Sequence, residues 1–212
     1  MKTAQMTRVC GGVDWSKLPR IEIDAPISES DSPATAYAQI CATEEALCLH
    51  LSATEPEVRA VETSPLAEVC EDSCLEFFFR PMEGSMRYFN MEWNPNKCLF
   101  LGFGSSIEDL LRIVPEEAQK EALFCPEVIR REDGWEIFFR VPYSFIRGFF
   151  PEFEVKPGKA LYCNFYKCGD KLRLPHYLTW NPILRKGPCR FHTPAEFGRL
   201  DVAGGARGQL RD

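Results

Sequence analysis

The chain has 212 residues, of which 45% are hydrophobic and 26% charged, and its formal net charge is −6. This composition supports a packed core and excludes a disordered chain, and the length fits one β domain. Nucleic-acid affinity depends on clustered Lys and Arg, and here the basic residues are scattered. A membrane span needs about 20 apolar residues, and the apolar stretch Phe138–Pro151 is shorter and contains two arginines. We therefore expect neither nucleic acid nor a membrane as a partner.

The first clear strand pattern is a period-two alternation near residue 50. Leu47, Leu49 and Leu51 share one face, and the intervening residues are Cys48, His50 and Ser52. This alternation predicts a half-buried strand. Leu75 to Arg80 is a continuous apolar run with three phenylalanines and no Gly or Pro, which predicts a central strand covered on both faces.

The next pattern, from Tyr88 to Asn94, alternates most sharply. The members of its apolar face are Phe89, Met91 and Trp93, and those of its polar face are Tyr88, Asn90, Glu92 and Asn94. We expect the first face to be packed and the second to be available for binding. The turn residues 94–96 then predict a hairpin into a second apolar strand over 97–103.

The segment 105–120 has the most helical pattern in the chain and predicts one or two short helices in a crossover. Strand patterns resume over 125–130, 134–141 and 159–167. Many short strands and little helix indicate an all-β fold, an antiparallel β-sandwich of the jelly-roll or immunoglobulin-like type. We expect a single domain over residues 1–202 and a flexible Gly-rich tail over 203–212.

Several blocks resemble, in order, the pattern of family 9-like carbohydrate-binding modules, which belong to the DOMON-like β-sandwich superfamily. The blocks are Glu68–Phe78, Tyr88–Asn94, Gly134–Pro142, Asn164–Asp170, His176–Pro182 and Phe191–Gly198, and the segment Ala36–Leu51 fits the first hairpin of the family. The resemblance covers nearly the whole chain. It implies a non-catalytic module that binds a mono- or oligosaccharide.

A sugar site of this kind uses an aromatic platform for the C–H face of a pyranose and planar polar groups for its hydroxyls. The resemblance implies Trp180 as the platform, presented at the surface of a short loop between two prolines. The polar partners that it implies are Asn90, Glu92, Asn94, Asn164, Lys167, His176 and Asp72. We assign Trp93 and Trp135, which lie in alternating strands, to the core.

Two other functions stay open. A glycoside hydrolase could use a pair of carboxylates from Asp72, Glu76 and Glu92. A third reading is a sandwich repurposed for protein contacts, because relatives often have Trp, as a second wall of the sugar slot, where this chain has Cys70. We expect no catalytic residues in a binding module, although a glycoside hydrolase could be its associated partner.

Cofactors and compartment follow from the remaining residues. The ten cysteines form no paired CxxC array, so no metal site is predicted and no cofactor is expected. Structural calcium on Glu71 and Asp72 is an alternative that the relatives suggest. The first 15 residues lack the apolar segment of a secretory signal, and several cysteines lie in apolar strands. We therefore expect free thiols and a cytoplasmic protein.

Overall fold

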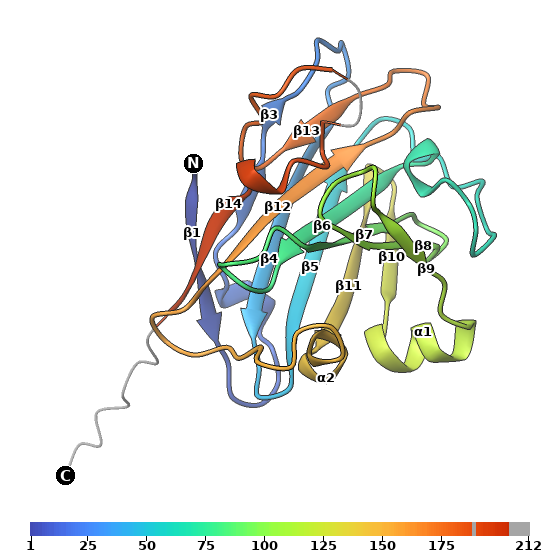
Figure 1. Cartoon of the computed structure of the whole chain (residues 1–212). Coiled ribbons are helices and arrows are strands. Elements are labelled where there is room, and N and C mark those ends of the chain that lie inside the picture. Colours follow the sequence, from blue (N-terminus) through green and yellow to red (C-terminus); the bar gives the residue numbers. More distant parts are fainter. Residues whose placement is uncertain (188–189, 204–212) are drawn as a thin grey trace.

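Two facing β layers make up the fold in the computed structural model, which describes residues 1–187 and 190–203 (Figure 1). One layer has the order β10-β11-β5-β4, with β2 also paired to β4. Its strands are β2 (Ile21–Ile23), β4 (Thr35–Ala42), β5 (Ala46–Thr54), β10 (Glu127–Arg131) and β11 (Gly134–Pro142).

The second layer has the order β14-β12-β6-β7-β8-β9, and β13 pairs with both β12 and β3. Its strands are β3 (Ala25–Pro26), β6 (Cys74–Arg80), β7 (Tyr88–Trp93), β8 (Leu99–Gly104), β9 (Leu111–Ile113), β12 (Ala160–Cys168), β13 (Tyr177–Thr179) and β14 (Gly198–Val202). All pairs within the two layers are antiparallel.

Strand β1 (Thr3–Arg8) joins the layers at one edge. Its first part pairs with β14 and its last two residues, Thr7 and Arg8, pair with β4, in both cases in parallel. The predicted all-β antiparallel sandwich is thus confirmed, and β1 adds parallel pairing that the sequence did not indicate. In β1 only Ala4 and Met6 alternate with polar residues, and this pattern is too short to predict a strand.

The core lies between the two layers and is built by alternation. Leu47, Leu49 and Leu51 of β5 point into it from one side, and Phe77 and Phe79 of β6 point into it from the other. Trp93 and Trp135 are fully buried in the same core, as predicted. Every residue of β6 is buried, which confirms that this central strand is covered on both faces.

The helices lie partly where the sequence placed them. Helix α1 spans Glu117–Phe124 and α2 spans Tyr143–Arg147, with short 3-10 turns η1 (Trp15–Lys17), η2 (Val69–Glu71) and η3 (Pro194–Glu196). The helical prediction for residues 105–116 is wrong: residues 105–110 form a turn, because the Asp109 carboxylate accepts hydrogen bonds from the backbone N–H groups of Ser105 and Ser106, and Leu111–Ile113 form strand β9. Such a side chain competes with helical hydrogen bonding, and the helix begins only after Pro115.

The chain ends are described only in part. Ala203 donates its backbone N–H to Met6 O, while the predicted tail beyond it, residues 204–212, lies outside the described residues. Within the described part of the chain, no helix is long and apolar enough to cross a membrane. The boundary between domain and tail stays a prediction.

Candidate functional site

The outer face of the β12-β6-β7 layer carries the side chains that alternate away from the core. Glu76 of β6 lies directly between Tyr166 of β12 and Glu92 of β7 in the strand register. Phe78 lies two residues farther along the same face. The core-facing residues of β6 and β7 are all apolar, and Lys167 of β12 is a charged exception on the inner side, so this outer face is where β6 and β7 place their carboxyl groups.

A hollow with a cavity volume of about 460 Å³ opens over this face. Its floor consists of Glu76, Phe78, Glu92 and Cys168. Its walls come from segments that are far apart in the sequence, namely Ile27, Ser28, Cys70, Asp170, Tyr177, Gly187, Arg190, Phe191 and His192. A hollow that combines aromatic rings with a few convergent polar groups is the usual form of a small-ligand site.

Two carboxyl groups lie in the floor of the hollow. Burial raises the pKa of Glu92 to about 7, and it raises the pKa of Glu76 well above its ordinary value, with the neighbouring Glu92 charge adding to the effect. Asn90 Nδ2 donates to Glu92 Oε1 at 2.9 Å and so fixes that side chain from behind. Within the described residues, the buried Glu76 Oε2 and Asn90 Oδ1 have no hydrogen-bond partner. Buried polar atoms of this kind need a partner, which a ligand could supply.

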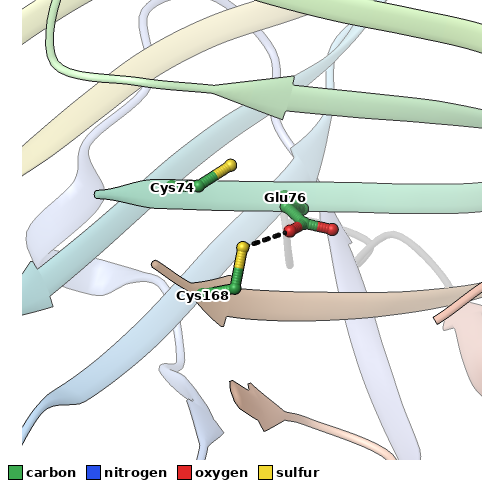
Figure 2. Close-up of side chains that lie close together, drawn as sticks. All are labelled: Cys74, Glu76 and Cys168. Carbon is green, nitrogen blue, oxygen red and sulfur yellow. Dashed lines mark hydrogen bonds between the residues drawn. The ribbon is translucent and has the colours of Figure 1, made fainter. Parts of the chain in front are cut away.

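Thiols surround the same carboxyl group. The Cys168 thiol donates to Glu76 Oε1 with a sulfur–oxygen distance of 2.9 Å, as the dashed line in Figure 2 shows. Cys74 lies opposite Cys168 in the strand register, and Cys70 lines the wall of the hollow. Burial raises the pKa of the Cys74 and Cys70 thiols, so both are protonated at neutral pH.

Two half-buried aromatic rings stand in the wall. The ring centroids of Tyr177 and Phe191 are 6.4 Å apart, and the planes are inclined by 75°. Phe191 also stacks on Tyr166, with centroids 4.1 Å apart and planes inclined by 10°. Arg190 donates from Nη1 to Ile27 O, which ties the wall segments together. The rings offer apolar surface beside the carboxyl groups of the floor.

Trp180 does not lie at this surface, so the prediction that its ring is presented to solvent is wrong. Its side chain is 4% exposed and packs in the main core, with its ring centroid 6.0 Å from that of Phe165. A Cβ added at Gly198 would come within 2.5 Å of the indole, so the glycine makes room for the ring. Trp180 follows β13 with the parity of Leu178, which points inward, whereas Tyr177 points outward.

The structure also separates Asn164 and Lys167, which the sequence analysis placed together. Lys167 is fully buried on the inner side of the layer, where Nζ lies 2.9 Å from Glu55 Oε2. Asn164 accepts the backbone N–H of Asn181 and donates to Asn181 O, which holds the chain after β13. Residues three apart in a strand face opposite ways, so the two could not share a binding face.

Asp72 and Asn94 hold a loop and lie outside the hollow. The Asp72 carboxylate accepts from Arg59, from the backbone N–H groups of Val61 and Glu62, and from Asn94 Nδ2. Asn94 Oδ1 accepts the backbone N–H groups of the following hairpin turn. With these oxygens occupied by protein donors, Asp72 suits neither a hydroxyl partner nor calcium, and it is ill-placed as a catalytic carboxylate.

His176 is the remaining predicted partner. It is 2% exposed, its Nδ1 lies 3.0 Å from Leu174 O, and its Nε2 lies 3.9 Å from Glu55 Oε2 on the inner side. It therefore faces away from the hollow. Of the predicted site residues, the structure brings only Glu92 to the hollow, with Asn90 supporting it, and adds Glu76 from the alternative catalytic set.

Sequence reasoning missed Tyr177, Phe191 and Cys168. For Tyr177 a signal was present, because it lies three residues from Trp180 and so has the opposite parity along the strand. Phe191 and Arg190 lie in an irregular segment without periodicity, and only the closed fold brings them over β6 and β7.

Comparisons with known proteins agree with this architecture. The family model described as carbohydrate-binding family 9 matches residues 13–202. A candidate carbohydrate-binding protein from Bacteroides uniformis has a similar structure, with 28% identity and a TM-score of 0.78 over 95% of this chain and 99% of that one. The comparison with curated proteins gave no match.

Two further similar structures come from Caldicellulosiruptor kristjanssonii, and each is a family 9 carbohydrate-binding module. The one in complex with cellotriose has 13% identity and a TM-score of 0.63 over 100% of this chain and 98% of that one. The one in complex with glucose has 12% identity and a TM-score of 0.65 over 99% of this chain and 100% of that one. At these identities the likeness shows the fold.

Proposed function

The chain belongs to carbohydrate-binding family 9, and we propose on this basis that it binds a mono- or oligosaccharide, without catalysis, in the outer-face hollow over β6, β7 and β12. The observation that carries the proposal is the hollow itself. It sets two half-buried aromatic rings, Tyr177 and Phe191, beside the buried carboxyl groups of Glu76 and Glu92.

This combination matches the chemistry of a pyranose. The C–H faces of the sugar pack on aromatic rings, and the hydroxyl groups need directed donors and acceptors. We assign the first task to Tyr177 and Phe191, in place of the buried Trp180. Glu92, Asp170 and Arg190 line the hollow within reach of the same space and supply acceptors and a donor.

The protonation of Glu92 suits hydroxyl recognition. Since its pKa is about 7, at neutral pH the group populates both the carboxylate, which only accepts, and the carboxylic acid, which also donates. Sugar hydroxyls both donate and accept, so either form has a complementary partner. Asn90 keeps the carboxyl group in place through its hydrogen bond to Oε1.

A glycoside hydrolase is the second candidate, because Glu76 and Glu92 face one hollow and both have raised pKa values. Such a pair can in principle provide an acid and a base. Asp72 is not a candidate for this pair, because its oxygens accept hydrogen bonds from residues of the loop 59–62 and from Asn94. Binding without turnover separates the two candidates.

A panel of mono- and oligosaccharides tests the proposal. We expect at least one glucose- or cello-oligosaccharide-type ligand to raise the melting temperature of the full chain without releasing reducing sugar. Reducing-sugar release that disappears in Glu76→Gln would support the hydrolase. A panel without any thermal shift and without binding by calorimetry would contradict sugar recognition and favour the protein-contact reading. An associated hydrolase and a cytoplasmic location remain predictions from the sequence.

A further inference from the structure

Three buried side chains at and beneath the floor of the hollow hold their ligand atoms close together, and two of them, Glu76 and Cys168, line the hollow. The three are Cys74 and Glu76 of β6 and Cys168 of β12 (Figure 2). The two sulfur atoms and a Glu76 oxygen all lie within 4.8 Å of one another, and each residue is at most 1% exposed.

Strand geometry fixes this cluster. Cys74 and Glu76 are two residues apart on β6, so they project from the same face of the strand. Cys168 lies opposite Cys74 in the antiparallel register, and Tyr166, two residues earlier on the same face of β12, lies opposite Glu76. The three ligand atoms are therefore held by two paired strands rather than by mobile loops, which favours a preformed site.

The spacing fits a tetrahedral metal ion. Zinc binds thiolate sulfur at about 2.3 Å and carboxylate oxygen at about 2.1 Å, so two sulfurs on one ion are about 3.8 Å apart and a sulfur and an oxygen about 3.6 Å apart. The present sulfur–oxygen distance of 2.9 Å between Cys168 and Glu76 belongs to a hydrogen bond. It would need to open by roughly 0.7 Å to admit the ion.

A second observation points to a ligand at the same place. Glu76 Oε2 is buried and has no hydrogen-bond partner within the described residues. Glu76 and Cys168 line the hollow, which gives an ion a path from solvent. Cys70 and Glu92 line it too and add a thiol and a carboxyl group near the open side of the cluster.

We propose that Cys74, Cys168 and Glu76 form a binding site for a thiophilic divalent cation of the Zn²⁺ class, with the fourth position open to the hollow. Two sulfur ligands select such an ion over Ca²⁺ or Mg²⁺, which prefer oxygen. On binding, the two thiols and the protonated form of the Glu76 carboxyl group give their protons to solvent as the metal bonds form, and the Cys168–Glu76 hydrogen bond is replaced by two bonds to the ion.

Co²⁺ reports directly on this ligand set, because thiolate coordination gives ultraviolet charge-transfer bands and tetrahedral geometry gives strong visible bands. The full chain, reduced with a phosphine and freed of metal, is titrated first with Co²⁺ and then with Zn²⁺. We expect one equivalent of Co²⁺ to produce both sets of bands and Zn²⁺ to abolish them.

Variants assign the signal to the cluster. We expect Cys168→Ser and Glu76→Gln each to weaken Zn²⁺ binding by more than about 100-fold, since loss of even an outer-shell partner costs about 10–100-fold. The matched control is Cys10→Ser, which removes an exposed thiol and should leave the titration unchanged. A thermal melt of each variant establishes whether it is folded. If one ligand variant does not fold, the other still tests the site.

Three outcomes would overturn the proposal. They are a reduced wild-type chain without cobalt bands, bands that persist in folded Cys168→Ser, and a Cys74–Cys168 disulfide that resists reduction. The metal site shares Glu76 and the hollow with the proposed sugar site, but its ligand and its readout are different. Glycan binding measured in the presence of a chelator tests the proposed function alone, so the two can fail separately.

Discussion

The direction of single side chains decides which aromatic residue reaches the hollow. Tyr177 and Trp180 are three residues apart, and alternation sends the first outward to the hollow and the second inward against Phe165. A tryptophan near polar residues suggested a platform from its type alone. Its place in the strand register determines its role, and that register is known only once β13 is paired with β12.

Trp180→Ala should therefore act on stability. Replacing a buried tryptophan leaves a cavity, and we expect the free energy of unfolding to fall by about 3–5 kcal/mol, measured by denaturant titration. The affinity of the remaining folded protein for its glycan should stay within about threefold of the wild-type value. A folded variant of unchanged stability that has lost glycan binding would return the platform role to Trp180.

Glu92 makes stability depend on pH. Its pKa is raised from 4.5 to about 7 in the folded state, so between these values the folded protein holds a proton that the unfolded chain has lost. By linkage, the free energy of unfolding then falls as the pH rises from about 5 to 7, by about 3 kcal/mol at most for this group. Above pH 7 it levels off.

Glu92→Gln removes the titrating carboxyl group and should flatten the decline of stability with rising pH. We expect the variant to be more stable than the wild type at pH 8, and to differ much less from it at pH 4.5, in urea titrations. Glu22→Gln, an exposed carboxyl group on β2, serves as the control and should leave the slope unchanged. An equal decline with pH in wild type and Glu92→Gln would contradict the raised pKa.

At the scale of elements, the sequence predicted best the strands with strong alternation. The strands β5, β6, β7, β8, β10, β11 and β12 all occur where alternation or an apolar run placed them. The strands β1, β13 and β14 did not stand out, because each is only three to six residues long and so shows too short a pattern. The hairpin between β7 and β8 was visible from the turn residues 94–96.

Strand β12 shows why the site residues were harder to predict. It is buried on both faces, yet each face carries both polar and apolar residues. Lys167 looks like a surface residue by type, yet its ammonium group lies in the interior beside Glu55. Glu55 in turn accepts a hydrogen bond from Trp135 Nε1. The Lys167 charge is accommodated there because Glu55, which is far away in the sequence, pairs with it, and no local sequence pattern predicts that pairing.

Lys167→Met tests this buried pair. The substitution keeps the volume of the side chain and leaves Glu55 as a buried carboxylate without its cation, so we expect a loss of about 3–5 kcal/mol in unfolding free energy. Lys171→Met provides the comparison. The Lys171 side chain is 58% exposed in its ion pair with Glu71, and the loss of this pair should cost about 1 kcal/mol or less. Similar small losses in both variants would show that the buried pair adds little.

At the scale of the whole molecule, the two layers have different tasks. The β4-β5-β11 layer closes the core, and the β12-β6-β7 layer presents its outer face to the hollow. The walls of that hollow come from residues as far apart as Ile27 and His192. The ordered sequence blocks that resemble the family were enough to predict a function. The position of the site could not be predicted in the same way, because it depends on contacts between segments that are far apart in the sequence.

Isothermal titration calorimetry of the best glycan against Tyr177→Ala and Tyr37→Ala tests the central claim most directly. Both tyrosines are half-buried, but Tyr37 lies on β4 in the other layer, under Arg20. Loss of one aromatic wall should remove about 1–2 kcal/mol of binding free energy. We predict an affinity about tenfold weaker for Tyr177→Ala and unchanged for Tyr37→Ala. Unchanged affinity in folded Tyr177→Ala, or an equal loss in both variants, would contradict sugar binding in this hollow.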